Sequence, residues 1–354
     1  MMFIMLMMIT IVAMVVVMNW LFVLLASQRT TQLADTLALS SVAAILDEGL
    51  LNDLPADQID DISEVEDLVF DLRELNNVAT SARLRLQDAD ITIIFGHVAD
   101  ASSPITGANF DTAPPVGTLL NAVRIDVLRD PAGSNPLELM IRSLGAPNAV
   151  KVTSAAFGVL DSRVIGYRPT ATVASPVIPI AIQSAAWFID RPANAVNELT
   201  VTLLSNGGVG TANGALIAMD TSALFNISPI DGQIQNGITS ADLAAEVFGF
   251  ETTRATQISP GMADTNAIVG TLNALDTLSP LKDDRRVFPI FDTFADPIVL
   301  TGFIGARILS AANTNGADPT IELVIEPEFI VHFTAETDPN EAENVYLHKI
   351  RLAR

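Results

Sequence analysis

The chain opens with a largely apolar stretch that carries no charge from Met1 to Gln28, and Arg29 is its first charged residue. Neither Gly nor Pro occurs before Gly49, so we expect one helix of roughly 45–50 residues at the start of the chain. The uncharged part would be about 42 Å long, which exceeds the roughly 30 Å of a bilayer's hydrocarbon core. We therefore expect lipid, or copies of the same helix, to cover this surface.

After Arg29 the same helix becomes amphipathic. Large apolar side chains alternate there with small ones, and small side chains let another helix or a sheet approach closely. The large residues are Leu33, Leu37 and Ile45, and the small ones are Ala34, Ala38, Ser41 and Ala44. We expect close packing of another element along this part of the helix.

A secretory signal peptide is the competing interpretation of the opening stretch. Such a peptide has a basic start, a shorter apolar core and a small-x-small cleavage site. Here the apolar run is longer, and Ala26-Ser27 makes a weak site, so an anchor is favoured. A helix inserted with its N-terminus in the cytoplasm normally carries Lys or Arg upstream of the apolar run. We therefore hypothesise that a basic leader has been removed, as in pilin-type processing. The opposite topology, with Arg29 cytoplasmic, is the alternative.

The rest of the chain predicts one more long helix and a strand-rich body. Between Asp47 and Glu74 apolar residues recur at helical spacing among eleven acids and one base, Arg73, which indicates a second amphipathic helix packed on a core. Its apolar positions are Ile59, Ile62, Val65, Leu68, Val69, Leu72 and Leu75. From residue 80 onward, short β-branched runs alternate with turn residues, as is typical of strands. The predicted strands are Arg83–Gln87, Ile91–Phe95, Ala122–Leu128, Val150–Val159, Glu198–Leu204, Leu216–Met219, Ile298–Leu309 and Ile321–Phe333.

We therefore predict an α+β fold: a long N-terminal hydrophobic helix followed by a β-rich body with a few short helices. The short helices are expected at Pro136–Leu144 and Ser240–Phe248, and a turn at Asp231-Gly232. The run 169–179 is expected to cross between two modules. The predicted domains are a transmembrane or assembly helix (1–50), an α+β domain (51–175) and a second β-rich domain (176–354).

The charge balance excludes one class of partner. The chain has 41 acids against 19 bases, for a net charge of -22, so binding to nucleic acid is disfavoured. It has no cysteine, so there is no disulfide framework, thiolate nucleophile or Cys-type zinc site.

No motif identifies a catalytic, cofactor-binding or metal site, and we predict that the protein is not an enzyme. His97, His332 and His348 are too scattered for a recognised metal motif. The run Gly207–Gly214 lacks the P-loop lysine, so a hairpin loop explains it better. A loop of oxygen-bearing side chains near the C-terminus could hold Ca²⁺, although a solvated acidic loop is the simpler interpretation. Its residues are Glu336, Asp338, Asn340 and Glu341.

Several segments, taken in order, resemble the Tad (tight adherence) TadE/TadG-like family. The hydrophobic helix runs into Gln32–Ser40, which is similar to the family's helix. A strand, a turn-helix and a second strand ending in Ala-rich sequence then follow in the family's order. These segments are Val123–Arg129, Asn135–Met140, Leu144–Thr153 and Ala171–Ala174. The resemblance covers roughly residues 1–180, with departures at Met5, where pilins carry an acid, and at Thr36, where the family has alanine.

The resemblance implies a pilin-like structural subunit of a cell-surface filament, without catalysis. Its partners would be copies of itself or other pilin-like subunits, bound through residues 1–50, with the membrane as host during assembly. The protein would be membrane-anchored or assembled at the cell surface, with an extracytoplasmic body. The alternative is a solitary membrane-anchored binding module or adhesin, whose helix stays in lipid.

Overall fold

The protein is seen in a computed structural model that divides into two compact units. Unit 1 comprises Met1–Asp47, Leu54–Leu160 and Ile350–Arg354, and unit 2 comprises Glu48–Asp53 and Asp161–Lys349. The structure describes residues 2–45, 58–78, 85–101, 105, 109–115, 118, 120–130, 135–139, 149–186, 198–204, 212–217, 227–243, 250–252, 255–256, 265–275, 285–295, 297–314, 320–341, 344 and 346–353. The expected domain ranges stay predictions, because compactness alone does not test which segments fold independently.

Helix α1 (Met2–Ala44) opens unit 1 and confirms the expected long N-terminal helix. Its second half buries a stripe of residues spaced three or four apart, as one face of a helix does. The buried residues of this stripe are Ala26, Thr30, Leu33, Ala34, Leu37, Ala38, Ser41 and Val42. Three of the four small residues singled out in the sequence are therefore in the packed face.

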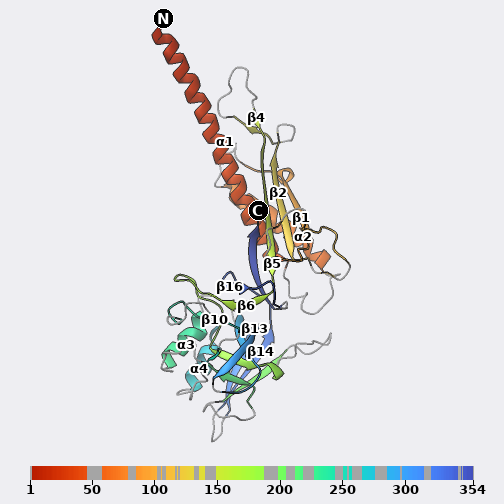
Figure 1. Ribbon diagram of the computed structural model, residues 1–354, viewed down its shortest axis with the longest axis vertical. Helices are drawn as coiled ribbons and strands as arrows, with labels where there is room; N and C mark the ends of the chain where they lie inside the picture. The colour runs from red at the N-terminus through yellow and green to blue at the C-terminus, as the bar shows by residue number, and fades with distance from the viewer. Residues whose placement is uncertain are drawn as a thin grey trace. The chain divides into compact units, whose positions relative to one another are not determined.

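The stripe packs on an antiparallel sheet of strands β1 (Ile91–Gly96), β2 (Ala122–Arg129) and β5 (Val152–Asp161). In Figure 1, α1 runs alongside this sheet, and its N-terminal part extends past the rest of unit 1. Alternate residues of β2, among them Val123 and Ile125, point into the core shared with α1. The period of two along β2 thus matches the helical stripe that faces it.

Helix α2 (Gln58–Val78) covers the same core through Val65 and Val69, as expected. The expectation was wrong for Leu75, which is 68% exposed near the end of the helix. Smaller elements complete unit 1, together with the end of β17, where Ile350 packs on the core. These elements are η3 (Asp88–Asp90), β3 (Leu137–Glu138), β4 (Ala149–Val150) and β17 (Leu347–Ala353).

Unit 2 is built around a closed ring of six strands. Their hydrogen-bonded order is β13-β12-β7-β9-β8-β14, and β14 returns to β13. The strands are β7 (Ile180–Gln183), β8 (Leu199–Leu204), β9 (Gly214–Leu216), β12 (Arg285–Phe291), β13 (Ile298–Thr314) and β14 (Thr320–Pro327). The register shifts at Ile290/Phe291 and at Ile308/Ser310, where β13 has the extra residue in both cases, bend β13, and such a bend helps a sheet to close. Closure leaves these six strands no free edge.

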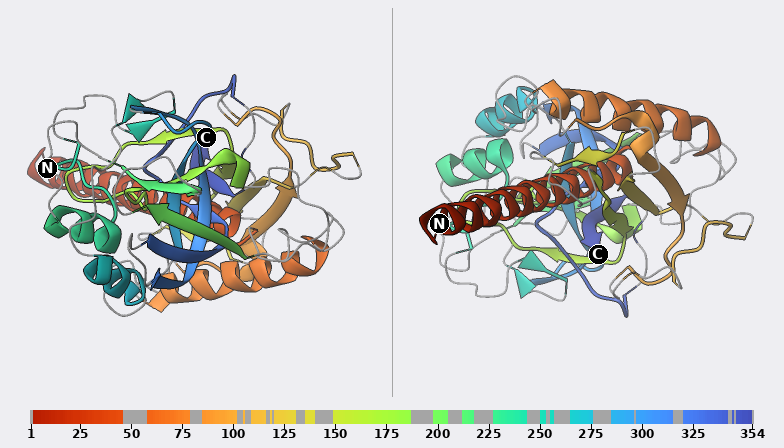
Figure 2. Two further views of the ribbon diagram at one scale, coloured as in Figure 1. Left: turned by 90° about the horizontal axis from the view of Figure 1, so that it is seen from below. Right: turned by 90° about the horizontal axis from the view of Figure 1, so that it is seen from above.

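The remaining elements of unit 2 surround the ring. Helices α3 and α4 lie side by side in both views of Figure 2, and their apolar residues Ile234 and Ile268 belong to the core of the unit. A three-stranded sheet has the order β10-β6-β16. The bounds are β6 (Val164–Tyr167), η4 (Ser184–Ala186), α3 (Ile227–Asn236), β10 (Phe250–Glu251), β11 (Ala255–Thr256), α4 (Thr265–Leu272), β15 (Ile330–Val331) and β16 (Ala335–Thr337).

Several local predictions were wrong. Residues 85–87 are not a strand, 136–139 hold strand β3 instead of a helix, and 240–243 form a turn. Residues 83–84, 140–144 and 244–248 of those three predicted elements lie outside the described residues. The strand expected at 216–219 occurs at 214–216, and the expected final strand is divided into β14 and β15. The Asp231-Gly232 pair lies inside α3.

Candidate functional site

The first half of α1 is an apolar surface that the described part of the chain leaves uncovered. Met2 is 88% exposed, Met8 is 66% exposed and Trp20 is 63% exposed. Exposed side chains occur on all sides of the helix from Met2 to Met18, with Val15 half-buried. This helix is long and apolar enough to cross a membrane, by length and composition.

The polar side chains of this half are placed so that the outward surface stays apolar. The hydroxyl of Thr10 donates to the carbonyl oxygen of Leu6 at 2.9 Å, within the helix itself. Asn19, the most polar residue of the stretch, is 9% exposed. A helix in lipid must satisfy its polar groups internally or against protein, and both residues meet that requirement.

The transition from bare to packed helix occurs around Ala26. Ala26 is 3% exposed and forms a small apolar cluster with Leu137 and Val152, against which Phe22 and Val23 also pack. The last turns of the apolar stretch are therefore part of the fold of unit 1. A cut near Ala26 would remove those contacts.

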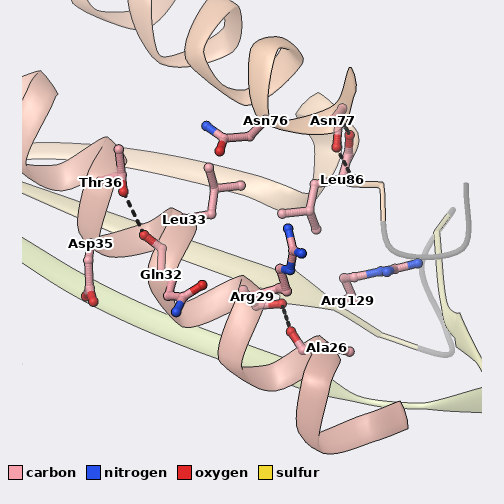
Figure 3. A pocket seen from close by; sticks show the side chains of 11 residues that line it. Ala26, Arg29, Gln32, Leu33, Asp35, Thr36, Asn76, Asn77, Leu86 and Arg129 are labelled. Atoms are coloured by element: carbon pink, nitrogen blue, oxygen red, sulfur yellow. Dashed lines mark hydrogen bonds between the residues drawn. The ribbon is translucent and has the colours of Figure 1, made fainter. Parts of the chain in front are cut away.

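A cavity of about 470 Å³ opens beside α1 just after this transition. It lies between α1, the end of α2 and the end of β2, and Figure 3 shows the side chains that line it. The lining residues are Ala26, Arg29, Thr30, Gln32, Leu33, Asp35, Thr36, Asn76, Asn77, Leu86 and Arg129. Two guanidinium groups and one carboxylate are among them, so the lining is locally cationic.

Arg129 is a fixed part of the cavity wall. It is 3% exposed, and its Nε donates to the carbonyl oxygen of Asn135 at 3.1 Å while Nη2 donates to Asn135 Oδ1 at 3.1 Å. Burial lowers the pKa of Arg129, and the charge of Asp90 partly offsets that effect. Asn135 in turn donates to Asp90. The guanidinium is thus held in one orientation by groups behind it.

The opposite side of the cavity is formed by α1 and the end of α2. Asn77 donates to the carbonyl oxygen of Leu86 at 2.7 Å and accepts from its N–H at 3.0 Å, which fixes the wall there. Arg29 and Gln32 are exposed side chains on α1. Figure 3 shows Asp35 well apart from Arg129.

Unit 2 holds a pair of carboxyl groups on either side of a glycine. Glu251 of β10 and Glu336 of β16 both pair with Gly166 of β6, and a Cβ there would lie 2.8 Å from Glu251 Cγ. Burial raises the pKa of Glu251, and the neighbouring Glu336 carboxyl raises it further. Arg168 lowers it and forms an ion pair of 3.0 Å with Glu336.

The structure places the candidate residues from the sequence in separate surroundings. The histidines are scattered in the sequence, and two of them are neighbours in the fold, since the backbone N–H of His332 donates to the carbonyl oxygen of His348 at 3.1 Å. The ring of His332 contacts the Thr334 hydroxyl, and burial lowers the pKa of His332 to about 4. His97 pairs with Asp111 in unit 1. Among the described residues, no group of three or more His, Asp or Glu side chains could hold a metal ion.

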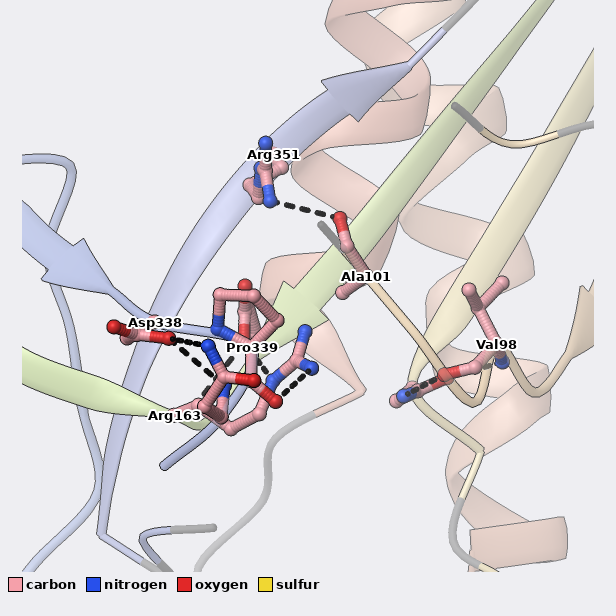
Figure 4. Close-up of polar contacts among 9 residues, drawn as sticks. Val98, Ala101, Arg163, Asp338, Pro339 and Arg351 are labelled. Atoms are coloured by element: carbon pink, nitrogen blue, oxygen red, sulfur yellow. Dashed lines mark hydrogen bonds and ion pairs between the residues drawn. The ribbon is translucent and has the colours of Figure 1, made fainter. Parts of the chain in front are cut away.

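The acidic loop near the C-terminus is tied together by its own hydrogen bonds. Asp338 Oδ1 accepts from Asn340 N–H at 2.8 Å, and Glu341 N–H donates to the Asp338 carbonyl oxygen at 3.2 Å. Figure 4 shows Asp338 beside Arg163, which donates to the Pro339 carbonyl oxygen at 3.3 Å. Most of Gly207–Gly214 lies outside the described residues, and Gly214 is in β9.

Sequence reasoning missed the groups that matter most. Arg129 was assigned only to a strand, and no local signal marks it as a cavity residue. Arg286, which no motif marks, is fully buried, and its guanidinium donates to the carbonyl oxygens of Ile234 and Gln235 at the end of α3. The apolar run Val287–Phe291 that follows Arg286 was the available signal for a strand.

The chain matches no protein-family model, and it has no match among the curated proteins or the solved structures.

Proposed function

We propose that this protein is a membrane-anchored structural subunit that assembles through α1 into a cell-surface filament of the pilus type, with its body outside the cytoplasm. One observation carries the proposal: a single helix is bare and apolar in its first half and packed into a folded body in its second. Such a helix inserts in lipid before assembly, and copies of it can bundle afterwards. The resemblance to TadE/TadG-like proteins supports the same function.

The energetics favour an assembly dominated by α1. Each apolar side chain removed from water contributes roughly 25 cal/mol per Å² of buried surface. The body is acidic, since the chain carries a net charge of -22, and like-charged bodies keep their distance in water. Attraction between copies is therefore expected along the helices, and the bodies form the exterior.

A solitary anchored binding module or adhesin is the second candidate, and the composition of the bare half favours it. Helices that pack closely in membranes use small residues at the interface. Between Met2 and Leu25 the sequence offers mainly Met, Val, Leu and Ile, with Ala13 the one alanine. Large flexible side chains suit lipid as well as they suit a loosely packed bundle.

The absence of cysteine from the chain gives a clean test. Single cysteines placed at the exposed positions Met5, Met8, Val12 and Val16 would be oxidised in intact cells. A filament predicts disulfide-linked dimers from at least one of these positions. The buried Asn19→Cys variant and the exposed body variant Glu322→Cys serve as controls. If no helix position gives a higher yield of disulfide-linked dimer than these controls, the filament proposal fails and the solitary anchor is supported.

A further inference from the structure

The cavity beside Arg29 begins directly after the apolar stretch of α1, so its position along the helix is fixed relative to that stretch. From Met2 to Leu25 the uncharged, largely apolar stretch is about 36 Å long, enough to cross the roughly 30 Å of a hydrocarbon core. Its last turns already contact the body, since Phe22 and Val23 pack against Leu137 and Val152. The α1 residues that line the cavity begin at Ala26, directly after this stretch, and end at Thr36. If the helix spans a membrane, the mouth of the cavity is at the level of the lipid headgroups.

The charge of the lining suits a phosphate group. Among the lining residues, Arg29 and Arg129 carry positive charge and Asp35 carries negative charge, and the carboxylate of Asp90 lies behind Arg129. Two guanidinium groups thus line one cavity in a chain whose net charge is -22. Guanidinium groups match phosphate oxygens with paired N–H donors. An anion is therefore attracted to this part of the chain although the whole protein repels anions.

The site is built into the fold, because one of its cations is buried. The Arg129 guanidinium is held by Asn135, so it needs no reorganisation when a ligand arrives. Arg29 is exposed on α1 and can close over the ligand. The exposed amide of Gln32 offers a further donor, and Leu33 and Leu86 give the same cavity an apolar wall.

We infer that this cavity binds a phosphate ester, with the headgroup phosphate of a glycerophospholipid as its source. The apolar wall takes the glycerol backbone, and the guanidinium groups take the phosphate. The inference rests on the proposed membrane anchoring for the source of the ligand, whereas the chemistry of the cavity rests on its own lining.

Native mass spectrometry of the full chain, released from nonionic detergent micelles doped with phosphatidylglycerol, tests the inference. Bound phosphatidylglycerol is expected, and diacylglycerol, which lacks the phosphate, is expected to bind weakly. Arg29→Gln should weaken phosphatidylglycerol binding about fivefold, since a basic residue near an anionic lipid contributes about 1 kcal/mol. Asp35→Asn should tighten binding by a similar factor.

The matched control is Lys151→Gln, which removes the same charge from an exposed residue of unit 1 that does not line the cavity. Its affinity should stay within about twofold of the parent, because a screened charge away from the ligand contributes little. Equal affinity for diacylglycerol would overturn the inference. So would identical affinities of Arg29→Gln, Asp35→Asn and Lys151→Gln.

Competition by glycerol phosphate and inorganic phosphate distinguishes the two sources of the ligand. If soluble phosphate esters bind as tightly as phosphatidylglycerol, the cavity is a phosphate site whose ligand is soluble. If neither the soluble esters nor the lipid binds, the inference fails. Flotation with phosphatidylcholine vesicles tests the anchoring separately. A chain that floats but shows no phosphate binding contradicts this inference alone, and a chain that binds glycerol phosphate but does not float contradicts the proposed function alone.

Discussion

Gly158 of β5 lies directly against the backbone of Ala38 in α1: a Cβ atom on Gly158 would lie 2.1 Å from the carbonyl oxygen of Ala38 and 2.8 Å from its carbonyl carbon. Ala38 itself is fully buried. The contact is between two backbones, so no side chain can move aside to relieve a clash. Helix and sheet approach this closely because both positions have the smallest side chains available.

We predict that Gly158→Ala destabilises the packing of α1 on its sheet by about 3 kcal/mol, at the upper end of the usual cost of overpacking a core. Hydrogen exchange of the α1 amides between Leu33 and Val42 is the measurement, because it reports on this half of the helix. Gly302→Ala is the matched control, since a Cβ at Gly302 in β13 meets no atom within 4 Å. Equal exchange rates in the two variants would show that the close approach is wrong.

The buried cation of unit 2 leads to a second prediction. Arg286 donates to the last carbonyl oxygens of α3, Ile234 and Gln235, at 3.2 and 3.3 Å. Arg286→Met would leave these acceptors without that donor, and an unsatisfied buried polar group costs about 1–3 kcal/mol. We expect a loss of about 3 kcal/mol in the free energy of unfolding, measured by urea denaturation. Arg286→Lys keeps the positive charge but lacks the forked N–H donors of the guanidinium, so its free energy of unfolding should fall by less. A neutral effect of Arg286→Met would rule out this capping role.

The hydroxyl of Tyr167 gives a prediction of the opposite sign. Tyr167 is 1% exposed, its ring packs edge-on against Phe303 at 5.6 Å, and its hydroxyl oxygen has no hydrogen-bond partner in the described part of the chain. Burial raises the pKa of this phenol. Because an unpaired hydroxyl is costly to bury, Tyr167→Phe should stabilise unit 2 by about 1 kcal/mol in urea denaturation. A loss of stability would mean that the hydroxyl has a partner after all.

The carboxyl pair across Gly166 predicts a pH dependence. Because the pKa of Glu251 is raised in the folded protein, its contribution to stability is full below its ordinary pKa and is lost as the pH rises through the raised value. Glu251→Gln mimics the protonated form. We expect this variant to melt at a higher temperature than the parent at neutral pH. The difference between the two melting temperatures should shrink as the pH falls toward 4.5.

The control for this prediction is Glu322→Gln, which neutralises an exposed carboxylate on β14. Its melting temperature should follow that of the parent at every pH. If Glu251→Gln behaves in the same way, the raised pKa of Glu251 is contradicted.

How much of this fold the sequence predicts depends on whether local pattern and tertiary contacts agree. Helix α1 follows from its uninterrupted apolar residues, and β2 and β5 follow from β-branched runs bounded by turns. Helix α3 could not be predicted, because the pair Asp231-Gly232 is typical of a turn and glycine disfavours a helix interior. The burial of Ile230 and Ile234 in the core of unit 2 overrides that propensity.

The candidate site could be predicted only in part. The uncharged apolar stretch is evident in the sequence from Met1 to Gln28. The cavity is not, because Arg29, Asn76 and Arg129 come from three elements far apart in the sequence. Only folding brings them together, and neither spacing nor composition marks them in advance.

The state of the intact chain in water tests the central claim most directly. Analytical ultracentrifugation of the protein prepared without detergent, with mass spectrometry confirming that residues 1–28 are present, is the measurement. We predict that the chain sediments as an assembly or with membranes, because the exposed apolar side chains in the first half of α1 must be buried in lipid or against other copies. A stable monomer of 37.6 kDa in water, with that helix intact, would contradict the account.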